Sequence, residues 1–473
     1  MKKLLIALIA LVTVASCQNL TELNRDTKNP EEVPAGTLFA NATVELFDFM
    51  VSTNVNVNNL RLWSQYWTET TYTDESNYEL IQRNVNGRTW NILYATVLRD
   101  LKEARKFIDA DPLLSDENRK NQLAMISVLE AFTGHLLVDF FGDVPWSDAL
   151  GSDITPAYDD DASVYQAVMD KLDAAIADLG GESGIGDFDL IYGGDVNMWK
   201  KFANGLKLRL AIRIANVDPT KAQTMANEAI NGGLIASNDE NVDLAYTSSP
   251  PHTNPLWVDL VQSGRNDFVA ANTLVDYMND LEDPRRAYYF SDVTDSLGNP
   301  IGGIFGASNN YNEYSHPGTM LLDPTFPGTI MDYVEMEFLQ ADVAARFDND
   351  MSAAETHYNN AIRASILYWG GTNQEADDYL ANPKVAWGTA AGTSLEKIAM
   401  QKWLAMYNRG FEGWSTYRVY NAPVLNNAAE AGTPPPLRYI YPVDEYSLNG
   451  TSVNDAVAAN PGYDEFLPIF WDN

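Results

Sequence analysis

The segment WKKFANGLKLRLAIRIANVDP (residues 199–219) gives the strongest indication of how this chain folds. Apolar residues recur along it at helical spacing, and Asp218-Pro219 ends the pattern, so the segment predicts one long helix. Arg209 and Arg213 lie one helical turn apart among these apolar residues. Because a buried charge is costly unless it is paired, we expect both arginines to bind buried carboxylates.

Helical patterns dominate the chain from about residue 36 onward. Amphipathic spacing predicts further helices at 89–108, 117–142, 161–181, 220–232, 330–347, 352–369 and 394–410. Helices could approach closely, as in stacked hairpins, where alanines stand beside larger apolar residues, at 172–176, 226–230 and 358–362. No fixed 34-residue repeat is found, so these residues fit both tetratricopeptide-like hairpins and an ordinary helical core.

Two regions depart from the helical pattern. Residues 238–330 contain Pro250-Pro251 and a stretch rich in Gly and Asn, and residues 421–473 contain three consecutive prolines with little periodicity. Loops of this length in a compact protein are usually functional or disordered. The aromatic residues in the first region argue against disorder. We therefore expect a mainly α fold in which these two regions are rich in loops.

The first residues have the layout of an export signal. Two lysines precede an apolar run (residues 4–14) that is too short to span a bilayer, and two small residues then lead to Cys17, the only cysteine in the chain. This order resembles a bacterial lipobox, in which the acylated cysteine becomes the first residue of the mature protein. We therefore predict lipid attachment at Cys17. The chain then divides into a signal peptide at 1–16, a lipidated tether over 17–35 and a folded domain over 36–473.

The composition limits the kinds of partner that the protein can bind. No stretch after Cys17 reaches the length and apolarity of a membrane span, so we expect the lipid alone to hold the chain at a membrane. The formal net charge is −34. Because such an acidic surface repels phosphate backbones, we expect no nucleic-acid partner. A single cysteine cannot form an intramolecular disulfide, so stability must come from the core.

Motifs of catalysis are missing from the sequence. His135, His252, His316 and His357 are scattered without the spacing of a zinc site, and His135 fits better as a core residue of an apolar helix. Thr393–Glu396 fits a helix capping box. We expect neither a cofactor nor an enzymatic activity, and leave a structural calcium ion open although no motif supports one. Two carboxylates that meet only in space leave no sequence motif, so a surface glycosidase is the rival interpretation.

Five segments, taken in order, resemble the SusD/RagB family of outer-membrane nutrient-binding lipoproteins. They are FFGDVPWSDAL (140–150), WKKFANGLKLRLAIRIANVDP (199–219), LEDPRRAYYF (281–290), FLQADVAAR (338–346) and IAMQKWLAMYNRGFEGWSTYRVYNAPVL (398–425). Their conspicuous residues fit a scaffold: Gly142 ends a helix, and Trp403 and Trp414 are suited to the core. The resemblance therefore indicates the fold more directly than the ligand.

The resemblance also implies a function. It implies a tetratricopeptide-like scaffold of helical hairpins with a loop-rich insertion that carries the ligand face. The protein would be a non-enzymatic lid on a TonB-dependent, SusC-like outer-membrane barrel, and would capture oligosaccharide for import, or peptide as in the RagB branch. A purely structural lid without a ligand is a further alternative. The residues after Cys17 lack the acidic cluster of a strong surface-export signal, so an orientation toward the cell surface follows from the family alone.

Two segments, 67–78 and 305–314, combine aromatic rings with short polar side chains. Rings cover the apolar face of a sugar or a side chain, and short polar groups bind hydroxyls or backbone. Trp63 and Tyr66, just before the first segment, fit better as core residues. We expect the two segments to meet as a ligand site, although the second loop could merely pack over the first. The predicted ligand-binding residues are Trp67, Tyr72, Asp74, Tyr78, Asn309, Tyr311 and Tyr314.

Cys17→Ala tests the predicted lipid anchor. Cys17 precedes a polar tether and lies outside the expected core, so the variant should fold normally, remain unacylated and leave the membrane fraction. Fractionation of cells that lack the barrel partner measures this loss against the unmutated protein. A variant that stays in the outer-membrane fraction would show that the lipobox interpretation is wrong.

Overall fold

A computed structural model describes residues 33–181 and 183–472 of the chain. The predicted signal peptide, Cys17 and the tether up to residue 32 lie outside the described residues. The helices are α3 (Ala35–Val51), α4 (Leu60–Trp63), α5 (Val85–Asn91), α6 (Arg99–Ala110), α7 (Asp116–Phe141), α8 (Asp161–Asp178), α9 (Val196–Arg213), α10 (Pro219–Gly232), α11 (Pro255–Trp257), α12 (Asn272–Asp280), α13 (Arg286–Tyr289), α14 (Tyr333–Val343), α15 (Met351–Tyr368), α16 (Asn373–Ala381), α17 (Ser394–Ala405), α18 (Gly410–Tyr420), α19 (Val443–Leu448) and α20 (Gly450–Ala459). Short strands pair in antiparallel twos: β1 (Trp67–Glu69) with β3 (Phe268–Ala270), β2 (Val242–Leu244) with β6 (Gly328–Met331), and β4 (Phe290–Ser291) with β5 (His316–Pro317).

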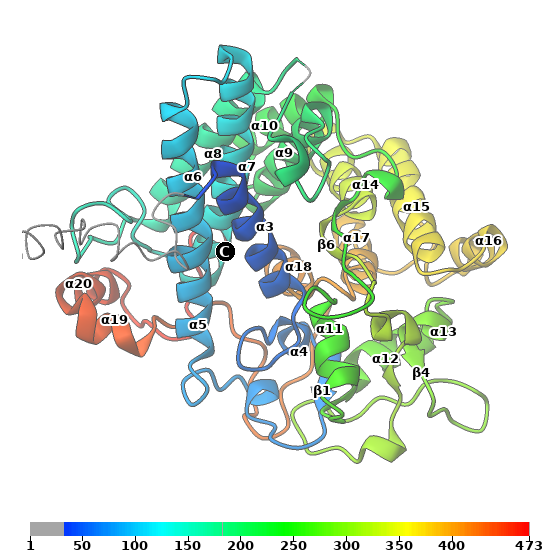
Figure 1. Ribbon diagram of the computed structural model, residues 1–473. Helices are drawn as coiled ribbons and strands as arrows, with labels where there is room; N and C mark the ends of the chain where they lie inside the picture. Colours follow the sequence, from blue (N-terminus) through cyan, green and yellow to red (C-terminus); the bar gives the residue numbers. More distant parts are fainter. Residues whose placement is uncertain (1–32, 182, 473) are drawn as a thin grey trace, which may run out of the picture.

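Helices that follow one another in the chain pack as pairs (Figure 1). Contacts join α7 to α8, α9 to α10, α14 to α15 and α17 to α18, and α3 lies against α6. Small residues allow this closeness in α10, where Ala222, Ala226 and Ala229 are fully buried. The predicted mainly α fold of helical hairpins is confirmed.

Local sequence signals located most of the helix boundaries. The predicted helix at 89–108 is part of one continuous helical segment, because the π-helical turn η2 (Ile92–Leu98) joins α5 to α6. Thr393 and Glu396 form the predicted capping box at the start of α17. Gly142 follows α7 with a φ of 75°, a backbone conformation that favours glycine.

The two loop-rich regions contain more regular structure than the sequence pattern predicted. Residues 238–330 hold β2 to β5 and α11 to α13. Helices α11 to α13 and strand β4 lie with α4 and β1 in a lobe below the helical pairs in Figure 1, whereas β2 pairs with β6, which contacts α3. The C-terminal region carries α19 and α20, which attach to an earlier loop where Asn449 donates to the carbonyl of Pro156 at 2.8 Å. These helices were missed because they are short, so few apolar residues repeat.

Helix α7 corrects one expectation about the membrane. By length and composition its 26 residues could cross a bilayer, contrary to the prediction that no stretch after Cys17 would qualify. In the protein, however, 89% of its most apolar window is buried, so α7 is the central helix of the core. His135 on this helix is fully buried and lies edge-on to Phe132 and Phe411, as a core histidine should. Burial lowers the pKa of His135 well below its usual value, which favours the neutral ring.

Arg209 and Arg213 of α9 bind buried carboxylates, as predicted. Arg209 pairs with Glu335 of α14 through bonds of 2.7 and 2.8 Å, and Arg213 pairs with Glu412 of α18 at 2.9 and 3.0 Å. Arg213 also reaches Asp139 of α7 at 3.4 Å. Burial by itself raises the pKa of Glu412, but Arg209 and Arg213 outweigh this effect and hold that pKa well below its usual range. Glu335 and Glu412, whose pKa values the arginines lower, therefore stay charged inside the core, and the contacts of the two arginines join four helices.

Aromatic residues fill the space between α4, α7 and α18. Trp414 is fully buried, as predicted, and its indole N–H donates to the carbonyl of Pro436 at 2.7 Å. Its ring packs edge-on against Trp63 at 5.4 Å and is stacked with Phe140 at 6.0 Å. Tyr66 and Trp403 are also fully buried, so the core interpretation of these residues is confirmed.

Glu412→Gln tests the buried ion network. The change leaves Arg209 and Arg213 without their shared carboxylate, so it should lower the free energy of unfolding by about 3–5 kcal/mol. Because the folded-state pKa of Glu412 is depressed, its contribution is present above the unfolded value near 4.5 and is lost as the pH falls below it. Chemical denaturation at pH 7 and pH 3.5 measures both effects. Glu355→Gln, on the exposed face of α15, is the matched control and should change little.

Trp414→Ala tests the aromatic part of the core. The cavity left by the indole should lower the free energy of unfolding by about 3–5 kcal/mol, and Trp414→Phe, which keeps a ring, should cost clearly less. Thermal or chemical denaturation measures both. A shift in melting temperature of under about one degree for Trp414→Ala would contradict the packing described above.

Candidate functional site

Strands β1 and β3 bring together the two segments that the sequence singled out. β1 pairs with β3 from Trp67 opposite Ala270 to Glu69 opposite Phe268. The segment 304–309 then lies along the other side of β1. Asn309 donates from its backbone to the carbonyl of Thr70 at 3.1 Å and from its side chain to the carbonyl of Glu69 at 3.0 Å. The expected meeting of 67–78 with 305–314 is therefore confirmed as packing, and their role in ligand binding stays a prediction.

A polar cavity of about 310 Å³ opens beside β1 and β3. Three segments that are distant in the chain contribute to it, namely the loop after α3, the loop after β1, and the stretch from η5 (Val258–Gln262) to β3. Its lining residues are Thr53, Asn54, Val55, Asn56, Glu69, Thr71, Tyr72, Arg83, Asp259, Ser263, Arg265, Asp267 and Phe268. Amides, hydroxyls, carboxylates and guanidinium groups therefore surround one aromatic ring that faces solvent.

Tyr72 is that ring. Its residue is 68% exposed, which is high for an aromatic side chain, and its φ is 58°. Positive φ is uncommon for bulky residues, yet three other residues in this part of the chain also have it, namely Gln65, Tyr78 and Asn84. Strained backbone of this kind persists where surrounding contacts hold it, often at binding sites. The loop thus presents Tyr72 to solvent at the edge of the cavity instead of burying it.

The charges that line the cavity are largely matched. Arg265 pairs with Asp267 through bonds of 2.5 and 3.0 Å, and Arg83 pairs with Glu75, which lies behind the cavity wall. Burial raises the pKa of Asp259 to about 6, so this carboxyl is ionised at neutral pH. The cavity therefore offers many hydrogen-bond donors and acceptors without the large negative charge of the chain as a whole.

The structure corrects the expected exposure of three predicted site residues. Trp67 is fully buried and donates its indole N–H to the hydroxyl of Tyr407 at 2.8 Å, so neither face of its ring is free for stacking. Tyr78 is buried edge-on against Trp63. Asn309 is buried too, and its side-chain amide is used to fix its own loop. None of the three lines the cavity.

The other predicted residues are more accessible but do not form one surface. Tyr72 lines the cavity, whereas Asp74, Tyr311 and Tyr314 are half-buried and lie outside its lining. The ring of Tyr311 is already stacked on His316, with centroids 3.7 Å apart. Sequence reasoning missed the residues of the loop after α3 and of the stretch from Asp259 to Asp267. The run TNVNVNN (53–59), unusually rich in Asn, was the available signal for the first of these.

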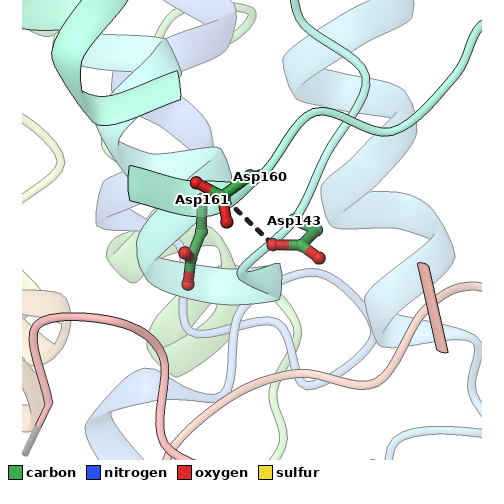
Figure 2. Close-up of side chains that lie close together, drawn as sticks. All are labelled: Asp143, Asp160 and Asp161. Atoms are coloured by element: carbon green, nitrogen blue, oxygen red, sulfur yellow. Dashed lines mark hydrogen bonds between the residues drawn. The ribbon is translucent and has the colours of Figure 1, made fainter. Parts of the chain in front are cut away.

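Three aspartates lie close together at the start of α8 (Figure 2). Ligand atoms of Asp143, Asp160 and Asp161 fall within 4.8 Å of one another, as a cation site would require. Their oxygens already accept hydrogen bonds from the protein, however. Asp143 accepts from the backbone of Asp161 at 2.9 Å and from the side chain of Asn460 at 2.7 Å, and Asp160 caps the helix. These bonds account for the cluster by themselves, so it does not add support for the structural calcium ion that the sequence left open.

Comparison with known families gives a match over most of the chain. A family model described as "Starch-binding associating with outer membrane" matches residues 27–442. No curated protein matches the chain at a significant level.

Solved structures share the fold over nearly the whole chain. A chitin-binding SusD homologue from Flavobacterium johnsoniae is 25% identical, with a TM-score of 0.78, and the match covers 92% of this chain and 98% of that one. A SusD homologue from Bacteroides uniformis is also 25% identical, with a TM-score of 0.74 and coverage of 92% and 99%. A SusD-like protein from the Bacteroidetes is 21% identical, with a TM-score of 0.80 and coverage of 93% and 100%. The likeness to this last structure concerns the fold alone.

Proposed function

The chain belongs to the SusD-like family, and from this premise we propose that it is a lipid-anchored outer-membrane subunit that captures oligosaccharide for import. The observation that carries the proposal is the polar cavity with Tyr72 exposed at its edge. A pyranose presents apolar C–H faces and a rim of hydroxyls. An exposed ring beside amides, hydroxyls and charged groups matches both features.

Capture without chemistry is the mode of action that the family supports. SusD-like proteins are binding proteins, and the description of the family places them at the outer membrane. We propose that acylated Cys17 holds the protein at the cell surface, and that a TonB-dependent, SusC-like barrel receives the ligand. The family supports this partnership, and the predicted lipobox supports the anchor.

Oligosaccharide is preferred over peptide as the ligand. The name of the family refers to starch, and one homologue of the same fold is described as chitin-binding. In addition, the charges of the cavity are mostly paired among themselves, as Arg265 is with Asp267. An uncharged ligand can bind beside such pairs, whereas the charged ends of a peptide would compete with them. Peptide capture is the alternative outcome of the experiment below.

Titration calorimetry with chito-oligosaccharides, malto-oligosaccharides and short peptides tests the proposal. Tyr72→Ala should weaken binding of the cognate oligosaccharide by about 1–3 kcal/mol, by analogy with base–aromatic stacking. Because Tyr72 is largely exposed, the melting temperature of the Tyr72→Ala variant should hardly differ from that of the unmutated protein. Tyr446→Ala, which removes another exposed ring on α19, is the matched control and should bind normally.

Three other results would contradict the proposal. Binding of peptides alone would select the RagB-like alternative. Release of reducing sugar that survives repurification would indicate a glycosidase. Equal affinity of Tyr72→Ala and the unmutated protein, with both folded, would place the site outside this cavity.

A further inference from the structure

Two buried carboxyl groups meet beneath the loop that carries Tyr72. Glu69 ends β1 and is 3% exposed, and Glu75 begins the short turn η1 (Glu75–Asn77) and is fully buried. Oε2 of Glu69 accepts hydrogen bonds from the backbone N–H of Ser76 at 2.9 Å and from its hydroxyl at 2.8 Å. The charge of Glu75 acts directly on Glu69. A hydrogen bond between the two carboxyl groups requires a proton on one of them, since ionised carboxylates are acceptors only.

The surroundings place this proton on Glu69. Glu75 forms an ion pair with Arg83, which favours its ionised form. Apart from that ion pair, neither oxygen of Glu75 meets a well-oriented donor among the described residues, and an O–H on Glu69 supplies one. Burial first, and then the charge of Glu75, raise the pKa of Glu69 to about 9. Glu69 is therefore neutral at physiological pH.

No other charged group near Glu69 stabilises its ionised form, among the residues that the structure describes. Across the cavity, Arg265 is already paired with Asp267, and Asp259 is itself acidic. Arg61 is buried and acts on Asp259. On its own loop, Asp74 adds a second acidic group next to Glu75. Loss of the proton from Glu69 would thus place two negative charges together around the single guanidinium of Arg83.

The remaining contacts of the loop do not depend on protonation. Before Tyr72, Thr70 is held by backbone bonds to Asp267 and Asn309. After it, the side chain of Asn77 donates to the carbonyl of Gly306 at 2.8 Å and accepts from the backbone of Ala431 at 2.9 Å. Between the attachments at Thr70 and Asn77, the hydrogen bonds from Ser76 to the side chain of Glu69 join the turn at Ser76 to β1.

We propose that protonated Glu69 is a positioning residue that fastens the loop 70–83 to β1 and so fixes Tyr72 at the edge of the cavity. The inference rests on the proposed function for the ligand, whereas the fastening of the loop can be measured without any ligand. Ionisation of Glu69 keeps the two bonds from Ser76 but places a second negative charge against Glu75. This repulsion should loosen the loop, so ligand capture should weaken as the pH becomes alkaline.

Thermal unfolding of Glu69→Gln and of the unmutated protein, from pH 6.5 to 9.5, tests whether a proton on Glu69 stabilises the fold. The amide of Gln mimics the protonated acid and donates to Glu75 at every pH. Because the pKa of Glu69 is raised in the folded state, its stabilisation is complete below the unfolded value near 4.5 and is lost as the pH rises toward about 9. The melting temperature of the variant should therefore rise relative to the unmutated protein by at least ~2 °C over this range. Asp161, Asp243 and Asp259, whose pKa values burial raises to about 6, are common to both proteins. Parallel curves would overturn the proposal.

Hydrogen exchange locates the effect. Peptides that cover residues 70–83 should lose protection above about pH 9 in the unmutated protein but not in Glu69→Gln, with peptides from α9 as the internal reference. Uniform loss across the molecule would overturn the proposal, since it would indicate general destabilisation. If Glu69→Gln does not fold, Glu75→Gln serves instead. It removes the neighbouring negative charge, so an ionised Glu69 would face only Arg83 and the amide introduced at position 75, and the loss of protection should disappear. A loss of protection at the same pH as in the unmutated protein would overturn the proposal.

Measuring the affinity for chitotetraose tests whether the loop takes part in ligand capture. The dissociation constant of the unmutated protein should rise by about tenfold per pH unit above pH 9, and the profile of Glu69→Gln should be flat over the same range. Equal profiles would overturn the role of Glu69 in ligand capture. If no oligosaccharide binds at any pH, the proposed function fails, while the two ligand-free measurements still decide whether Glu69 fastens the loop.

Discussion

Two arginines on α9 determine how the helical pairs are held together. Arg209 joins α9 to α14 through Glu335, and Arg213 joins it to α18 and α7 through Glu412 and Asp139. Taking these charges out of water is expensive, and the cost is offset only while every partner is in place. The network therefore does more than add stability. It selects one arrangement of the helices, because any shift between them would leave a buried charge without a partner.

The same scaffold reaches the candidate site through hydrogen bonds to the chain around α17 and α18. Ser64 donates to the carbonyl of Gly410 at 2.6 Å, Tyr66 donates to the carbonyl of Trp403 at 2.6 Å, and Arg61 binds Asn408. These bonds anchor the segment that leads from α4 into β1. The loop after β1 can then hold a strained conformation, with Tyr72 exposed, because both of its ends are fixed.

Protonation and packing act together at this site. In a chain with a net charge of −34, a ligand cavity lined by several carboxyl groups would strongly disfavour anions. Here Asp267 and Glu75 are each paired with an arginine, and burial together with the charge of Glu75 raises the pKa of Glu69 to about 9. The lining of the cavity therefore carries little net charge at neutral pH, which suits the uncharged oligosaccharide proposed above.

Local patterns in the sequence were enough to predict the helical fold. Helices such as α9, α15 and α17 depend on spacing, caps and terminators within a few residues of one another, so local patterns located them. It could also be predicted that Arg209 and Arg213 need buried carboxylates, because a charged side chain on an apolar helix requires a partner of opposite charge once that helix is buried. The partner residues could not be predicted, since Glu335 and Glu412 lie more than a hundred residues away in the sequence. For the same reason the sequence misjudged Trp67, Tyr78 and Asn309, which are buried, although it anticipated that Tyr72 is exposed. Whether an aromatic ring in a polar segment faces solvent depends on distant residues such as Tyr407, and only the tertiary structure brings these together.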